Sequence, residues 1–148
     1  SNYLNFIKNK YNLVASFGFI EHFENYKEVF LQQTEMVESG GFLLVQFPNF
    51  KGVVQKKLHS FFDIDNLNNH VNDSMDLNTY QKLLSKDFEL VYCSYYGNFD
   101  FWIDDFQHKN GRVKRNLLRI FFKTKKFWNY LPNHRCYSPY AAIIARKK

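Results

Sequence analysis

Two adjacent ionisable residues, Glu21 and His22, are the best placed in this sequence for acid–base chemistry. A histidine side chain titrates near neutral pH, so His22 is the best candidate for a general base that takes a proton from a reacting group. We therefore expect His22 and Glu21 to be catalytic residues. The alternative is a structural histidine that pairs with Glu21 or with a backbone carbonyl.

A second candidate group lies in the polar stretch 51–76, which is predicted to be a long loop with helical turns. Its members are His59, Asp63, Asn66 and His70. Aromatic and aliphatic residues lie among them, and this mixture suits a sugar or another hydroxylated small molecule. The alternative for each residue is a solvated position in the loop. The histidines match no metal-ligand spacing, so no metal site is predicted.

The positive charge of the chain is concentrated in one segment. The formal net charge is +6, yet eight basic residues and no acidic residue lie between Lys109 and Lys126. The rest of the chain has twelve basic and fourteen acidic residues. An electrostatic partner is therefore expected at this segment.

The same segment has the periodicity of an amphipathic helix. One predicted face is apolar, with Val113, Leu117, Ile120, Phe121 and Trp128. The opposite face is basic, with Arg112, Arg115, Arg119, Lys123 and Lys126. The helix could pack through its apolar side, or 112–128 could contact an anionic membrane surface. Contact with nucleic acid is not predicted, because no recognised nucleic-acid motif accompanies the helix.

Apolar runs and turn residues predict the elements that would position these groups. Four strands are expected, at Tyr11–Ser16, Phe42–Phe47, Phe88–Tyr95 and Tyr140–Ala145. A helix should begin at Asn25, with Glu28 completing a capping box, and should end at Ser39-Gly40-Gly41. A shorter helix is expected at Leu77–Ser85. The first two strands and their helix form a crossover unit, which is typical of parallel sheets.

Composition limits the class of protein. Aromatic residues make up 20% of the chain, which argues against disorder and indicates a large apolar core or pocket. Cys93 and Cys136 form no disulfide framework and no zinc pattern, so a reducing cytoplasm is the expected location. No apolar run is long enough to span a bilayer.

Several runs, taken in order, resemble the middle and end of class I S-adenosylmethionine-dependent methyltransferases. The runs are YNLVASFGFIEHF, ESGGFLLVQFPN, LLSKDFELVYC and SPYAAIIARKK. In that family, a strand ending near a Glu-His pair is followed by a helix, a Gly-Gly turn and a strand that ends in Pro-Asn. Asp87 replaces the usual glycine in the third run. The resemblance is weakest across 104–134.

The resemblance implies that S-adenosylmethionine is the cofactor and that a small molecule accepts the methyl group. Ser16, Phe17 and Gly18 would contact the methionine part of the cofactor. Glu21 and His22 would follow at the floor of the pocket, and the stretch 51–76 would cover the acceptor. The alternative for Gly18 is that it relieves a tight turn.

The family's glycine-rich loop and its first two strands have no counterpart in this chain. The resemblance therefore implies the C-terminal half of a Rossmann-like α/β sheet, with about four strands and the last one antiparallel. We expect one partial domain over 1–148, with a basic helical insertion at about 104–131. The chain alone is expected to be inactive. The competing class is a non-catalytic module that docks through the basic helix on a membrane or an acidic partner.

The expected spatial order of the strands is first, second, fourth, third, which leaves 11–16 at an edge. An unpaired apolar edge strand promotes association. We therefore expect the chain either to form a homodimer through this edge or to require its missing half.

Overall fold

The computed structural model describes residues 9–103 and 111–148, which fall into two compact units. The first unit contains the chain up to Pro48, together with Val71–Ser94 and Ala141–Lys148. The second contains the described residues of Asn49–His70 and Tyr95–Tyr140. That the chain is one partial domain stays a prediction. The expected insertion at about 104–131 includes 104–110, which lie outside the described residues.

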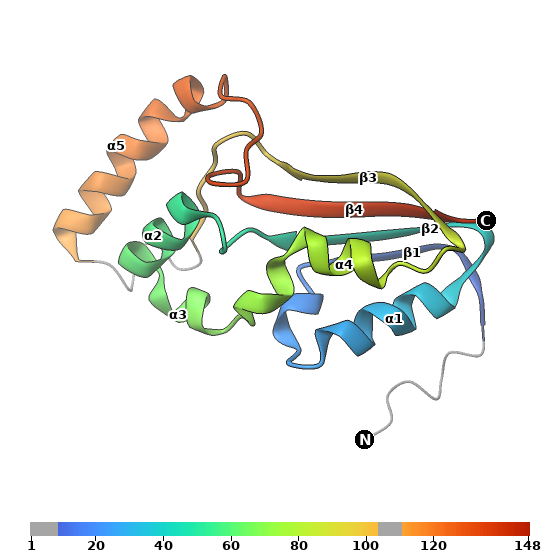
Figure 1. The fold of residues 1–148 in the computed structure, drawn as a ribbon. Coiled ribbons are helices and arrows are strands. Elements are labelled where there is room, and N and C mark those ends of the chain that lie inside the picture. The colour runs from blue at the N-terminus through green and yellow to red at the C-terminus, as the bar shows by residue number, and fades with distance from the viewer. Residues whose placement is uncertain (1–8, 104–110) are drawn as a thin grey trace. The chain divides into compact units, whose positions relative to one another are not determined.

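A four-stranded sheet has the strand order β1-β2-β4-β3 (Figure 1). The strands are β1 (Tyr11–Phe17), β2 (Val37–Pro48), β3 (Phe88–Tyr96) and β4 (Tyr140–Lys147). β1 and β2 are parallel, and the other neighbouring pairs are antiparallel. The predicted α/β class and the predicted spatial order are confirmed, and β1 lies at an edge of the sheet.

The helices of the first unit follow the strands they connect. They are η2 (Ile20–His22), α1 (Tyr26–Met36), η3 (Asn72–Met75) and α4 (Leu77–Leu83). Asn25 precedes α1 as predicted, but its side chain does not accept a backbone hydrogen bond. Instead, Asn25 Nδ2 donates to Glu28 Oε2 at 3.0 Å. The pair predicted as a capping box is therefore in contact, but it does not make the capping bond to the backbone.

The prediction that Ser39-Gly40-Gly41 ends the helix is wrong. α1 ends at Met36, and the three residues lie inside β2. Between the pairs Tyr11↔Val37 and Leu13↔Phe42, β2 advances further than β1, so the register is irregular there. Gly40 has a φ of +82°, and a Cβ at Gly41 would lie 2.9 Å from the carbonyl oxygen of Asn12. The glycines are needed for this irregular pairing rather than for helix termination.

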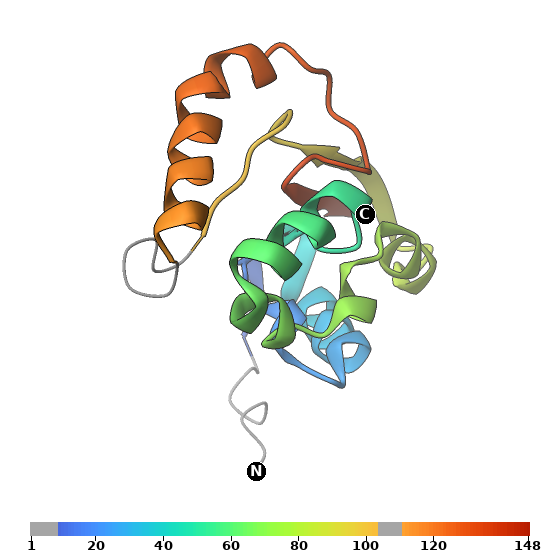
Figure 2. The same ribbon diagram turned by 90° about the vertical axis from the view of Figure 1, so that its left-hand side faces the viewer.

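An aromatic cluster joins α1 and α4 to one face of the sheet. The Tyr80 ring of α4 lies 4.9 Å from the Phe30 ring of α1 and 5.2 Å from the Phe47 ring of β2. All three side chains are fully buried, and the Tyr80 hydroxyl donates to the Ser74 carbonyl. Figures 1 and 2 show both helices on the same side of the sheet. Burial of these large apolar groups stabilises the first unit.

The two faces of the β1–β2 pair differ in how well they are covered. Val14 is paired with Leu43, and both side chains are buried on the face that carries α1. The neighbouring pair, Leu13 and Phe42, points to the opposite face, because side chains alternate along a strand. These two side chains are 59% and 40% exposed. At these positions the second face is apolar and accessible to solvent.

The second unit is more helical than predicted. It contains α2 (Val53–Phe62), α3 (Ile64–Asn68) and α5 (Arg112–Trp128). The prediction that 51–76 is mainly loop is therefore wrong, because helices occupy most of the stretch. No helix among the described residues is long and apolar enough to cross a membrane.

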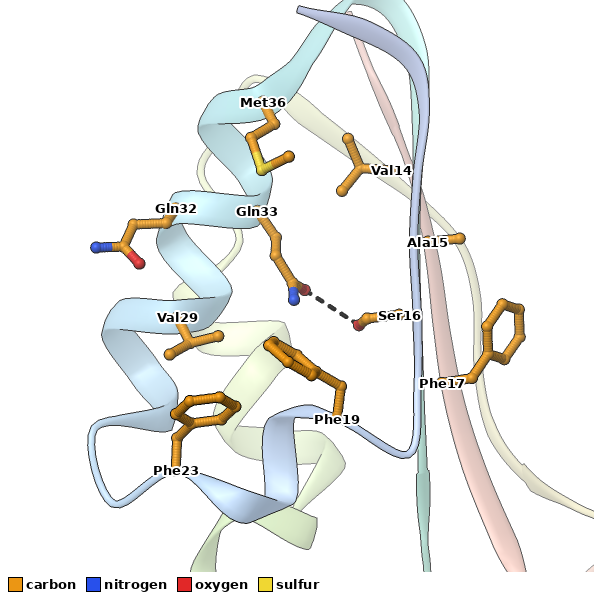
Figure 3. Close-up of a pocket in the computed structure, with 10 residues that line it drawn as sticks. All are labelled: Val14, Ala15, Ser16, Phe17, Phe19, Phe23, Val29, Gln32, Gln33 and Met36. Atoms are coloured by element: carbon orange, nitrogen blue, oxygen red, sulfur yellow. Dashed lines mark hydrogen bonds between the residues drawn. The ribbon is translucent and has the colours of Figure 1, made fainter. Parts of the chain in front are cut away.

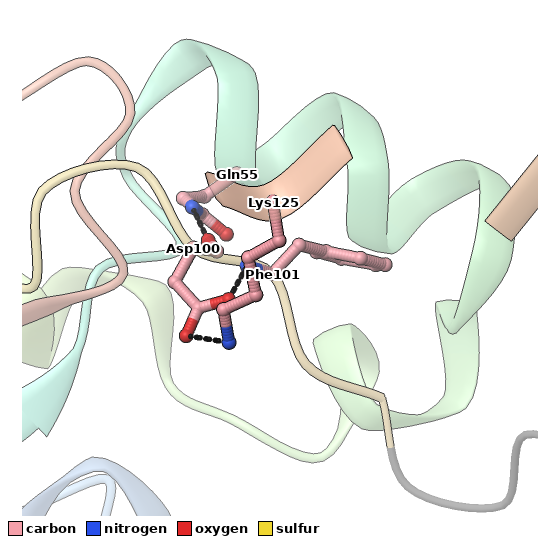
Figure 4. Close-up of polar contacts among 4 residues, drawn as sticks. All are labelled: Gln55, Asp100, Phe101 and Lys125. Carbon is pink, nitrogen blue, oxygen red and sulfur yellow. Dashed lines mark hydrogen bonds and ion pairs between the residues drawn. The ribbon is translucent and has the colours of Figure 1, made fainter. Parts of the chain in front are cut away.

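Two buried amides connect α2 to later segments of the second unit. Asn49 Nδ2 donates to the carbonyl oxygens of Arg135 and Ser138, at 2.8 and 2.9 Å. Gln55 Nε2 donates to the Asp100 carbonyl oxygen at 2.6 Å (Figure 4). It also donates to the Tyr137 carbonyl oxygen at 2.6 Å. Since each amide bonds to backbone far away in sequence, the pair holds the irregular segments of this unit in place.

Replacement of Phe30 by alanine should lower the free energy of unfolding by about 3–5 kcal/mol, because it removes a fully buried ring from the aromatic cluster. Urea denaturation measures the change. The matched control is Leu31→Ala at the next position of α1, where the side chain is 40% exposed. That substitution should cost about 1 kcal/mol or less. Equal losses in the two variants would contradict the assignment of the core.

Candidate functional site

A cavity of about 770 Å³ lies between β1 and α1 in the first unit (Figure 3). Its lining residues come from β1, α1 and the turn that joins them. They are Val14, Ala15, Ser16, Phe17, Phe19, Phe23, Val29, Gln32, Gln33 and Met36. The volume is in the range of small-molecule sites, so the cavity is the candidate functional site of this unit.

The cavity combines an apolar wall with a few polar groups. The Phe19 and Phe23 rings lie 4.8 Å apart. Ser16 Oγ donates to Gln33 Oε1 at 3.2 Å. The Oε1 atom of Gln32 is buried and has no hydrogen-bond partner among the described residues. Figure 3 shows the Gln32 amide on the side of α1 away from β1, whereas Gln33 points towards Ser16.

Of the three residues predicted to bind the cofactor, Ser16 and Phe17 line the cavity and Gly18 follows them. Ser16 points towards Gln33, whereas Phe17 points away from α1 and is 64% exposed (Figure 3). Gly18 has a φ of +58°, and its N–H donates to the Gln46 carbonyl at 3.1 Å. A Cβ on Gly18 would have an ordinary contact, so the backbone conformation is what favours glycine. Cofactor binding by these residues stays a prediction.

The predicted catalytic pair lies in η2, just after Phe19 of the cavity wall. Glu21 is 1% exposed, and this burial raises the pKa of its carboxyl. Its Oε2 atom has no hydrogen-bond partner among the described residues, while its carbonyl accepts from Val71 N at 2.7 Å. His22 is exposed. The catalytic roles of both residues stay predictions.

The four residues predicted to bind substrate belong to the second unit. His59 lies in α2, Asp63 lies between α2 and α3, Asn66 lies in α3, and His70 follows α3. His59 Nδ1 and Asp63 Oδ2 are 3.9 Å apart, and Asn66 Nδ2 donates to Asp63 Oδ2 at 3.0 Å. The Asn66 carbonyl lies 2.5 Å from His70 Nδ1. Their alternative as solvated loop residues is wrong for the first three, which are buried, while His70 is half-buried. Their role towards a substrate stays a prediction.

His59 is enclosed by aromatic rings. Its centroid lies 4.2 Å from Phe50, 4.8 Å from Phe101 and 5.4 Å from Trp102. The side chain is 0% exposed, and neither ring nitrogen has a hydrogen-bond partner among the described residues. Burial lowers the pKa of His59 to about 4, against a smaller opposing effect of Asp63. This histidine is therefore neutral near physiological pH, as part of an apolar core.

The sequence reasoning did not assign the polar groups on the α1 side of the cavity. Gln33 lies on the buried side of α1 together with Tyr26 and Phe30. A glutamine on an otherwise apolar helical face indicates a polar contact in the interior, because a buried amide requires a hydrogen-bond partner. Phe19 and Phe23 follow the strand in a turn, where no periodicity shows which way a side chain points.

Two solved structures have the same fold. One is a SAM-dependent methyltransferase from Archaeoglobus fulgidus, with 17% sequence identity, a TM-score of 0.54 and 99% of this chain covered. The other is MccD protein, with 18% identity, a TM-score of 0.53 and 97% covered. This chain spans 64% and 63% of the lengths of those chains. Comparison with family models and with curated proteins finds no match.

Acid should destabilise the chain partly through His59. Because the folded pKa is about 4 and the unfolded value is about 6.5, the stability from neutral His59 is present above 6.5 and is lost as the pH falls towards 4. Between about pH 7 and about pH 5, the parent chain should lose roughly 2 kcal/mol more unfolding free energy than His59→Phe.

Urea denaturation at both pH values measures this difference. The control is His134→Phe, which replaces an exposed ring and should keep the pH dependence of the parent. The same pH dependence in His59→Phe and in the parent would contradict a buried, neutral His59.

Proposed function

We propose that this chain is the C-terminal half of a SAM-dependent methyltransferase domain, and that the cavity between β1 and α1 forms one wall of its cofactor site. The observation that carries the proposal is the cavity itself, which lies beside an edge strand in a fold shared with a methyltransferase. In open α/β sheets, ligands bind at the carboxyl ends of strands, and Ser16 and Phe17 end β1.

The residues of the cavity fit part of S-adenosylmethionine. Phe19, Phe23 and Met36 offer apolar surface to the methylene groups of the ligand. Ser16 and Gln33 already form a hydrogen-bonded pair that can orient a further polar group. When bound, the cofactor supplies an electrophilic methyl group.

The second wall of the site would come from residues upstream of Ser1. β1 has an open edge, and Leu13, Phe17 and Phe42 expose apolar surface on the sheet face opposite α1. An edge and an apolar face of this kind are normally covered in a soluble α/β protein. We infer that the upstream half pairs with β1 and covers this face, so that the cofactor lies at the junction.

Methyl transfer requires the acceptor atom to align with the methyl group, so the main task of the protein is positioning. His22 would remove a proton from the acceptor where one must leave, because an exposed imidazole can exchange it with water. Glu21 would provide a buried carboxyl that stays protonated at higher pH than an exposed one. The acceptor would be a hydroxylated small molecule, such as a sugar or a biosynthetic intermediate.

Substitutions in the cavity should weaken cofactor binding in a protein that carries the upstream half. Ser16→Ala and Gln33→Leu should each lower the affinity for S-adenosylhomocysteine by roughly 3- to 10-fold, because each removes one hydrogen-bonding group. Calorimetric titration measures the affinity, and thermal unfolding checks that the variants remain folded.

The matched control is Glu35→Leu, an exposed position of α1 outside the cavity lining. It should bind S-adenosylhomocysteine as the parent does. Unchanged affinity in both cavity variants, with the fold intact, would contradict the assignment of this cavity to the cofactor.

A further inference from the structure

Helix α5 uses only a narrow part of its surface to pack in the second unit. Leu118 is fully buried, and the Phe121 ring lies 5.6 Å from Phe99 and 6.1 Å from Phe101. The predicted apolar face held Val113, Leu117, Ile120, Phe121 and Trp128. Of these, Phe121 and Trp128 pack against the Phe99 ring, whereas the other three are exposed. Successive residues of a helix are about 100° apart, so Leu118 points to a different side of α5 from Leu117. The packed side is the one that carries Leu118.

Three of the predicted apolar residues form an outward row together with Phe127. Its members are Val113, Leu117, Ile120 and Phe127, which recur at helical spacing on one side of α5. Val113 and Phe127 are 74% and 75% exposed, and the other two are also exposed. Tyr130 continues the exposed apolar surface beyond the end of the helix. A contiguous apolar row on a solvent-facing helix marks an interaction surface.

The cations of α5 are also divided between the two sides. Inward-facing Lys125 forms an ion pair with Asp100, whose Oδ2 atom lies 2.8 Å from Nζ (Figure 4). Four outward cations form a basic row: Arg112, Arg119, Lys123 and Lys126. All four are exposed, and none forms an ion pair with a described residue. The helix has no acidic residue, so this charge is not compensated within α5.

We propose that α5 binds the surface of a membrane that contains anionic phospholipid. The outward apolar row would enter the boundary between head groups and acyl chains, and the basic row would lie among the phosphates. Long basic side chains can extend to the head groups while their stems cover apolar surface. The helix has 17 residues and many charges, so it would lie in the plane of the surface rather than cross it.

The two rows together distinguish this partner from a purely ionic one. A nucleic acid or an acidic peptide would provide negative charge for Arg119 and Lys123. It would leave the side chains of Val113, Ile120 and Phe127 exposed to water. An anionic lipid surface can contact both the basic row and the apolar row, because its charged head groups lie directly beside its acyl chains. The binding surface belongs to the second unit, and it does not depend on the proposed cofactor site.

Flotation with vesicles tests the proposal in the whole chain. The probes are vesicles of phosphatidylcholine alone and vesicles of phosphatidylcholine mixed with phosphatidylserine in a two-to-one ratio. The parent chain should float with the mixed vesicles only. Arg119→Glu with Lys123→Glu should weaken the partition roughly 30-fold or more, because each cation near the surface contributes to attraction. Leu117→Ser with Ile120→Ser should weaken it roughly tenfold or more, because apolar burial is lost.

Matched controls use exposed positions on α2 of the same unit. Lys56→Glu with Lys57→Glu repeats the charge change, and Val53→Ser with Ile64→Ser, at the start of α2 and of α3, repeats the apolar change. Both controls should float as the parent does. Circular dichroism of all four variants should match the parent, since every substituted side chain is exposed.

Three results would overturn the proposal. The first is no flotation of the folded parent with the mixed vesicles. The second is equal loss in the α5 charge variant and in the Lys56/Lys57 control, which would mean that only net charge matters. The third is full binding by the Leu117/Ile120 variant, which would mean that the apolar row does not enter the lipid and that the contact is purely ionic.

Discussion

One-sided burial of the β1–β2 pair is the constraint on which the first unit depends. Side chains alternate along paired strands, so burying Val14 and Leu43 against α1 necessarily turns Leu13 and Phe42 to the other face. The buried face obtains its stability from the aromatic cluster around Tyr80. The opposite face remains apolar and accessible, and the cavity lies beside the same edge strand. The same pairing of β1 with β2 therefore produces both the buried core and the exposed apolar surface at Leu13 and Phe42.

Run length, residue type and turn residues were sufficient to predict the strands and the crossover helix. A short run rich in Val and Leu that ends at a turn indicates a strand, and β1 is a strand, although only Val14 of it is buried. The spatial order came from the resemblance, and the structure has that order. The likeness to two solved structures at 17% and 18% identity supports the same fold. Local pattern and fold agree for β2, where alternate apolar side chains are buried, whereas the apolar run of β1 is largely exposed.

The failures occurred where tertiary contacts override local pattern. Gly40 and Gly41 follow a helix and resemble a terminator, yet the irregular pairing of β1 with β2 is what requires them. Periodicity predicts an apolar side of α5 that includes Val113, Leu117 and Ile120. These residues are exposed, and Leu118 is the residue that is fully buried. His59 resembled a polar loop residue, and only the fold surrounds it with aromatic rings. In each case the deciding neighbour is distant in sequence, so no short window contains the information.

Calorimetric titration of S-adenosylhomocysteine tests the central claim most directly. The ligand is titrated into this 148-residue chain and into a longer chain that carries the upstream half. The account predicts no detectable heat with the 148-residue chain and restored binding in the longer one, because one wall of the site is proposed to lie upstream. Micromolar binding by the 148-residue chain alone would contradict it, since the cofactor would then be held without the wall that is proposed to be missing.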